Sequence, residues 1–260
     1  MAPGHLQQSL VALQTIVLKE VTRFLRIWAQ TLLPPAITMS LYFVIFGNLI
    51  GPRIGPMEGY TYMDFIVPGV IMLAVITNSY GNVVSSFFGA KFQRHVEELL
   101  VSPTPDAVIL AGYVAGGVAR GLCTGLIVTI VASLFTELQI HSLPIVISVV
   151  FLTSVLFSLG GFVNAVFARK FDDIAIIPTF VLTPLTYLGG VFYSISLLPD
   201  FWQGVSMANP VLYMVNAFRY GFLGASDIPV GIAYALIGTF IALLTVVCLV
   251  LLRKGVGLRG

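Results

Sequence analysis

The chain has 260 residues, of which 58% are hydrophobic and only 9% are charged, and its mean hydropathy is +0.99. About a quarter of the residues of a soluble domain are charged, so this composition excludes an ordinary soluble protein and indicates a membrane chain. The net charge of +2 gives no indication of a nucleic-acid partner.

Residues 5–30 predict an amphipathic elbow helix that lies in the membrane interface. Their apolar residues recur at three-or-four spacing, while Lys19, Arg23 and Arg26 share another face. A basic amphipathic helix rests at the interface. The alternative, a simple extension of the first span, would place three basic residues in lipid, where charge is costly. The stretch also lacks the compact apolar core and cleavage site of a signal peptide.

Six windows are long and apolar enough to cross the ~30 Å hydrocarbon core of a bilayer, which takes about 20 helical residues. The expected spans are residues 31–50, 65–88, 112–136, 143–166, 174–193 and 229–252. The predicted fold class is therefore an all-α polytopic membrane protein with six transmembrane helices in a single domain over residues 1–260.

The basic residues predict the orientation of these spans. Six spans place both termini on one side, and that side carries ten Lys and Arg residues against two on the other. The ten are Lys19, Arg23, Arg26, Lys91, Arg94, Arg169, Lys170, Arg253, Lys254 and Arg259; the two are Arg53 and Arg219. Positive residues stay on the cytoplasmic side, so both termini are expected in the cytoplasm. Arg120 lies within the third span and is either functional or snorkels towards the headgroups.

Polar stripes run along two of the expected spans. The stripe on the second span contains Asn78, Asn82 and Ser85 (or Ser86), and the stripe on the fifth contains Thr179, Thr183, Thr186 and Tyr187. A buried amide without a partner costs ~2–7 kcal/mol, so the asparagines need a hydrogen-bonding neighbour or water. Two interpretations stay open: helix-to-helix or own-backbone hydrogen bonds, and the lining of a pathway.

Residues 91–102 concentrate charge between the second and third spans and stop at Pro103. A helix here would carry one apolar face and one charged face. The apolar face contains Phe92, Val96 and Leu99 (or Leu100), and the charged face contains Lys91, Arg94, His95 and Glu98, with Glu97 at its flank. A helix resting on the anionic inner leaflet should be net basic, whereas this one balances two bases against two acids. The pattern favours docking on a protein over contact with headgroups.

The third and fifth spans lead to two further expectations. A ladder of small residues in the third span, Gly112, Gly116, Gly117, Gly121 and Gly125, predicts close helix packing. Residues 194–227, which follow the fifth span, are too polar and too broken by prolines to cross a membrane. Their aromatic residues are placed as an interfacial belt would be, so short helices at or dipping into the outer leaflet are expected.

Catalytic signatures are missing from the sequence. It has no phosphate-binding loop, nucleophile elbow or H-E-x-x-H motif, and its confident spans contain no acidic residue. Cys123 and Cys248 read as apolar packing residues, and the three histidines are too scattered for a metal site. Energy for any transport would therefore come from another subunit. A secondary transporter or channel is an alternative, and so is an ATPase-binding anchor or sensor.

The whole chain resembles the permease subunits of ABC-2 type transporters, most closely the YadH-like group of bacterial inner-membrane permeases. The most specific segment is LTPLTYLGGVFYSISLLPDFWQGVSMANPVLYMVNAFR, residues 182–219. KFQRHVEELLVSPTP and FGNLIGPRIG are also similar to family segments. Val211 departs mildly from the family pattern at its position.

The resemblance implies a multi-pass, bacterial inner-membrane subunit that is not itself an enzyme and holds no cofactor. It implies a homodimer that binds a soluble ATP-binding cassette ATPase, whose subunits hold ATP and Mg, and that exports by alternating access. It implies an ATPase-coupling helix over 91–102 with Phe92, Arg94, Val96, Glu97, Glu98 and Leu100. It places a pathway near Asn78, Asn82, Ser85, Thr179, Thr183 and Tyr187. It implies an outer gate with Pro199, Trp202, Asn209, Pro210, Tyr213 and Arg219. The cargo stays open among lipids, glycans and amphipathic small molecules.

Overall fold

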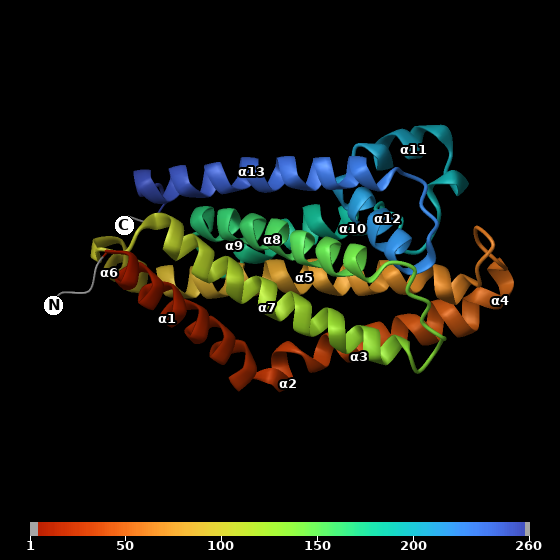
Figure 1. The fold of residues 1–260 in the computed structure, drawn as a ribbon, viewed down its shortest axis with the longest axis horizontal. Helices are drawn as coiled ribbons and strands as arrows, with labels where there is room; N and C mark the ends of the chain where they lie inside the picture. The colour runs from red at the N-terminus through yellow and green to blue at the C-terminus, as the bar shows by residue number, and fades with distance from the viewer. Residues whose placement is uncertain (1–4, 258–260) are drawn as a thin grey trace.

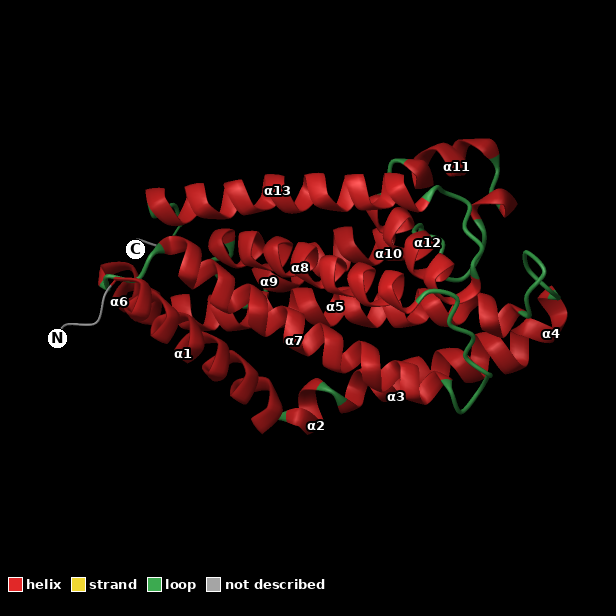
Figure 2. Cartoon of the chain, in the orientation of Figure 1, coloured by secondary structure: helices red, strands yellow, loops and turns green. Residues whose placement is uncertain are grey.

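The computed structural model of the protein describes residues 5–257 and is built from helices that run roughly along one axis (Figures 1 and 2). Within those residues no strand forms. Five helical segments are long and apolar enough to cross a membrane. They are Trp28–Ile54, α5 (Tyr62–Phe92), α7 (Asp106–Ala132), α8 (Leu143–Phe167) and α13 (Val230–Lys254). The all-α polytopic membrane fold is thus confirmed.

Helix α5 forms the centre of the bundle. In its most apolar 18-residue stretch 78% of the residues are buried, against 22% for α13 and 17% for Trp28–Ile54. It packs against α7, α8 and α12 (Pro210–Leu223), and Figure 1 shows α7 and α8 running along it. A helix that is apolar on all sides is covered either by protein or by lipid, and the burial of α5 shows that protein covers it. Helices α7, α8 and α12 therefore pack around α5.

The first span follows a bend. Helix α1 runs from His5 to Arg26, and the chain then continues through α2 (Trp28–Thr31), α3 (Leu33–Tyr42), the π-helical η1 (Phe43–Ile50) and α4 (Gly51–Ile54). The Thr31 hydroxyl closes the bend by donating hydrogen bonds to the carbonyls of Phe24 (2.9 Å) and Ile27 (3.2 Å). The elbow expected over 5–30 therefore ends as a helix at Arg26.

The segment expected as the fifth span is shorter than predicted. It comprises α9 (Asp173–Ile177), the π-helical η2 (Pro178–Leu182) and α10 (Thr183–Tyr187), where the sequence suggested 174–193. Pro178 and Pro184 each remove a backbone donor from the helix. Gly190 then has a φ of +70°, a conformation that suits glycine and turns the chain away.

The remaining helices cap the two ends of the bundle. Helix α6 (His95–Val101) lies at the end where α1 begins and α13 finishes, whereas α4 and α11 (Asp200–Met207) lie at the opposite end (Figure 1). A short 3₁₀ turn, η3 (Ile195–Leu197), precedes α11. Helix α6 is shorter than the expected 91–102 because Lys91 and Phe92 still belong to α5. Arg94 then adopts a φ of +63°, which breaks the helix.

The glycine ladder of α7 packs on two sides, which confirms the close packing that the sequence predicted. A Cβ at Gly116 would lie 2.5 Å from the Cβ of Glu20 on α1. On the other side, a Cβ at Gly121 would lie 2.0 Å from the Ser79 hydroxyl oxygen on α5 and 2.9 Å from that of Ser154 on α8. Glycine at these positions lets three helices approach α7 closely.

Substituting Gly121 by alanine should destabilise the bundle by about 1–3 kcal/mol, because the new methyl group overpacks the α5–α7–α8 contact. Gly238→Ala on α13 is the matched control, since a Cβ there meets nothing within 4 Å and helix propensity alone should favour alanine. The measurement is thermal unfolding of the purified chain in detergent. A Gly121→Ala variant that melts as high as Gly238→Ala would contradict the packing.

Candidate functional site

A buried carboxylate joins α1 to α5. Glu20 is 0% exposed, and its side chain accepts a hydrogen bond from the Ser86 hydroxyl at 2.6 Å and from the Arg23 guanidinium at 3.3 Å. Arg23 also donates to Asn82, at 2.8 Å to the side-chain oxygen and 3.1 Å to the backbone carbonyl. A charge withdrawn from water is tolerated only when it is paired and hydrogen-bonded. These partners meet that requirement for Glu20.

A second guanidinium extends this arrangement to α7. Arg120, near the middle of α7, donates to the side-chain oxygen of Asn78 at 3.0 Å and to the carbonyl of Thr31 at 3.3 Å. It is thus held between α5 and the bend after α1 instead of reaching out towards headgroups. We call Glu20, Arg23, Asn78, Asn82, Ser86 and Arg120 the polar cluster.

The polar cluster changes the interpretation of the stripe on α5. Asn78 and Asn82 make helix-to-helix hydrogen bonds, whereas Ser85 is exposed and donates to the Gly81 carbonyl at 2.7 Å. Sequence reasoning did not single out Glu20. The available signal was that Glu20 is the only acidic residue in 5–30, on a helix otherwise charged by bases.

Helix α6 presents charge at the end of the bundle. Arg94, Glu97 and Glu98 are exposed, as expected for residues that meet a partner. Val96 differs from the expectation, because it is only 3% exposed and packs in the protein's own core, where it anchors α6. Val101, which the sequence analysis did not select, is 86% exposed. The side chain of Leu100 lies outside the described part of the structure.

The junction between α5 and α6 is fastened to the end of α8 and to the loop that follows it. The Lys91 ammonium donates to the carbonyls of Val166 (2.6 Å) and Ala168 (2.7 Å), which are left free where α8 ends. The ring of Phe171 lies 5.0 Å from that of Phe88 and 4.9 Å from that of Phe92, between ring centroids. Phe92 therefore packs on its own chain with one face and remains 61% exposed.

A groove of about 230 Å³ lies between α3, α5 and the η2–α10 segment. We call it the central groove. Its lining consists of Thr38, Met39, Tyr42, Leu73, Thr77, Pro178, Leu182, Thr183, Thr186 and Tyr187. It brings together Thr183 and Tyr187 of the predicted pathway residues and leaves Asn78, Asn82, Ser85 and Thr179 outside. Sequence reasoning missed its contributions from the first span, since no periodicity indicated which face of that span meets α10.

The predicted gate residues build the junction at the opposite end. Asn209 starts α12: its side-chain oxygen accepts from the Val211 amide (2.9 Å) and its amide donates to the Leu185 carbonyl (2.6 Å), with Pro210 as the first helical residue. The Tyr213 hydroxyl donates to the Met207 carbonyl at 2.8 Å. Pro199 precedes α11, on which Trp202 is exposed.

Arg219 is the most deeply buried charge of this junction. It is 1% exposed, donates to the Gly190 carbonyl at 2.6 Å, and its guanidinium lies 3.9 Å from the centre of the Phe65 ring. It therefore connects α12 to α5 and to the turn after α10. Nearby, burial and the carboxyl of Glu58 raise the pKa of Asp227.

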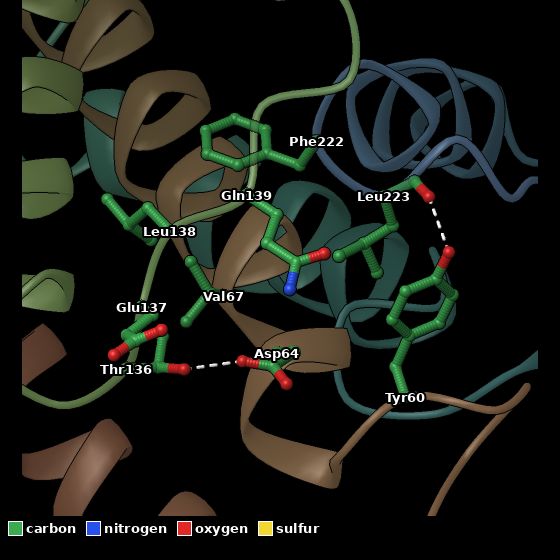
Figure 3. A pocket seen from close by; sticks show the side chains of 9 residues that line it. All are labelled: Tyr60, Asp64, Val67, Thr136, Glu137, Leu138, Gln139, Phe222 and Leu223. Carbon is green, nitrogen blue, oxygen red and sulfur yellow. Dashed lines mark hydrogen bonds between the residues drawn. The ribbon is translucent and has the colours of Figure 1, made fainter.

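A smaller hollow at this end is too small for a ligand, and the residues that line it hold two loops together (Figure 3). Its volume of about 10 Å³ has room for roughly one water molecule. Tyr60 donates its hydroxyl hydrogen to the Leu223 carbonyl at 2.5 Å, and Thr136 donates to the Asp64 carboxylate. These bonds hold the loop before α5 and the loop after α7 in place. Among the described residues, no group of three or more His, Cys, Asp and Glu could hold a metal ion.

Comparison with known proteins identifies the family. The family described as ABC-2 type transporter matches residues 11–223. The chain belongs to this family. It is 60% identical over 250 residues to the inner membrane transport permease YadH of Escherichia coli (strain K12), covering 96% of this chain and 98% of the relative. It is 23% identical over 215 residues to nodulation protein J of Rhizobium leguminosarum bv. viciae, covering 82% and 83%.

The family membership confirms the resemblance seen in the sequence. Together with the long apolar helices, it identifies an ABC-2 type permease subunit of the inner membrane that crosses the bilayer several times. An ABC-2 permease is a non-enzymatic membrane subunit, and its family implies an ATP-binding cassette partner in general.

Replacing Glu20 by alanine should loosen α1 and lower stability by about 1–3 kcal/mol, since Ser86 and Arg23 lose their buried acceptor. We expect a lower melting temperature and faster tryptic cleavage after Arg26, at the bend. Glu137→Ala, which removes an exposed carboxylate, is the control and should change neither. Equal cleavage rates and melting temperatures for the two variants would show that Glu20 does not hold α1.

Proposed function

We propose that this chain forms the membrane half of an ATP-driven exporter, as a homodimer that docks on a separate soluble ATPase through α6. The family membership supports an ATPase partner in general. The observation that carries the docking site is the placement of α6, a short charged helix fixed to the end of the most buried helix. The ATPase would bind ATP and Mg, and this chain would perform no covalent chemistry.

The exposed surface of α6 suits a protein partner. Arg94, Glu97 and Glu98 offer charge of both signs, and exposed Val101 and Phe92 offer apolar contact. Complementary charges fix the register of a docked partner, and desolvated apolar side chains supply affinity. An anionic lipid surface would instead select a basic helix.

The attachment of α6 supports a transmission route. Val96 is buried, Lys91 caps α8, and Phe171 packs on α5, so a push on α6 would be passed to α5 and α8. Close-packed cores move as bodies and do not deform smoothly. On one side, α5 is bonded to α1 through the polar cluster, so α1 would move together with α5. On the other side, α5 forms a wall of the central groove.

The remaining parts of the bundle would complete the membrane crossings and the outer exit. The α9–α10 segment would cross the membrane as the fifth of six spans, which would place both termini in the cytoplasm. Helix α1 would lie at the membrane interface. Helices α11 and α12 would close the outer exit around Arg219. A second copy would cover the apolar side chains exposed beside the central groove, such as Ile37, Leu41 and Phe180. The groove would then form the transport pathway together with its counterpart.

The decisive experiment is a charge reversal on α6, Arg94→Glu together with Glu98→Lys. It should abolish co-purification of the ATPase, at least tenfold in stoichiometry, while the permease stays inserted and folded, because docked charges would meet like charges. The matched control is Arg53→Glu with Glu137→Lys, the same reversals at exposed positions near the opposite end. Retained stoichiometric ATPase in the α6 variant would disprove the docking site.

The same preparation separates the alternatives. If no ATP-binding subunit accompanies the wild-type chain and transport follows an ion gradient, the chain is a secondary transporter or channel. If the ATPase binds but no cargo moves, the chain is an anchor or sensor.

A further inference from the structure

We propose that the central groove binds the uncharged head of an amphiphile that donates hydrogen bonds through hydroxyl or amide groups. This inference rests on the proposed transport function, because it names the chemistry of the cargo for that pathway. Three observations carry it: the absence of charge in the lining, the direction of the lining's hydrogen bonds, and the position of the groove on α5.

The lining carries hydroxyl and apolar side chains only. Among the described residues that form it there is no Lys, Arg, His, Asp or Glu. The guanidinium groups of the polar cluster lie outside this lining and are bound to Asn78 and Asn82. A charged head in the groove would therefore have no counter-ion there. Desolvation of an unpaired charge is costly, so this lining selects against both cationic and anionic heads.

Three of the six hydroxyl groups of the lining, those of Thr77, Thr183 and Thr186, are oriented as acceptors, whereas the Tyr42 and Tyr187 hydroxyls share one hydrogen bond of 3.5 Å. The Thr77 hydroxyl donates to the Leu73 carbonyl (2.7 Å), that of Thr183 to Pro178 (2.9 Å), and that of Thr186 to Thr183 (2.8 Å). A hydroxyl has one hydrogen and two lone pairs, so these groups retain acceptor capacity and have no hydrogen left to give. They are complementary to a ligand that donates hydrogen bonds.

The position of the groove strengthens the argument. Thr77 stands midway along α5, whose ends are Tyr62 and Phe92. If α5 spans the bilayer, this position lies near the midplane, where an unpaired charge is most expensive. Tyr187 and Phe180 are exposed at the side of the groove, and Met39 and Leu182 supply apolar walls. An apolar tail could therefore pack against these side chains, at the boundary with the second copy, while the head occupies the groove.

The test uses a decyl glucoside with a diazirine in its alkyl chain and the purified permease in nanodiscs of zwitterionic lipid. After photolysis, mass spectrometry should locate the label on α3, α5 and α10. Unlabelled decyl glucoside should compete with the probe at a concentration at least tenfold below that needed for decyltrimethylammonium or decyl phosphate.

The matched variants replace hydroxyls by methyl groups of similar shape. Thr77→Val with Thr183→Val should weaken labelling about fivefold for each hydroxyl lost, since each removes one acceptor from a neutral hydrogen bond. Thr239→Val on α13 is the control, because the Thr239 hydroxyl makes the same kind of bond to its own helix (2.8 Å to Ala235) outside the groove.

Equal or stronger competition by the charged probes would overturn the inference, as would labelling elsewhere or unchanged labelling of the double valine variant. The binding measurement needs no ATPase. Failure of the α6 docking experiment with selective glucoside labelling intact would therefore disprove the coupling route alone. An intact ATPase complex without selective labelling would disprove the cargo chemistry alone.

Discussion

The carboxylate of Glu20 sets a constraint that the rest of the bundle has to satisfy. A side chain that the protein covers completely cannot turn to water for a missing hydrogen bond, so its polar groups must find partners within the protein. Glu20 finds them in Arg23 and Ser86, and Arg23 in turn uses Asn82. Glycine on α7 lets α1 approach α7 closely, and this brings the side chains of Glu20 and Arg23 within reach of α5. The close packing of α1 on α7 and the hydrogen bonding of Glu20 therefore depend on each other.

Helix α5 connects two chemically different regions. Asn78 and its neighbour in sequence, Thr77, point to different sides of the helix, one into the polar cluster and the other into the central groove. Any rotation or shift of α5 changes both regions at once. The helix is also fastened at each end, by Lys91 at α8 and by Arg219 beside Phe65. Its motion is thus restricted to movements that its neighbours share.

Features that depend on residues close together in the sequence could be predicted, whereas contacts between distant segments could not. Five of the six long apolar windows, the helical period of residues 5–26 and the glycine ladder predicted features that the structure contains. Periodicity could place Asn78 and Asn82 on one face of α5 but could not name the arginines that meet them. The start of α6 was misjudged because Arg94 adopts a backbone conformation that its residue type rarely takes. The central groove was only partly visible because its walls come from three distant segments.

The polar cluster also has a consequence for biogenesis. Synthesis proceeds from the N-terminus, so Glu20 and Arg23 leave the ribosome well before Ser86, Asn82 and Arg120 exist to meet them. During that interval the two side chains, three residues apart on one helix, can satisfy each other. The basic amphipathic pattern of α1 would suit the membrane surface meanwhile. The same 22 residues would thus have to suit first the hydrated membrane surface and later a buried contact with α5 and α7.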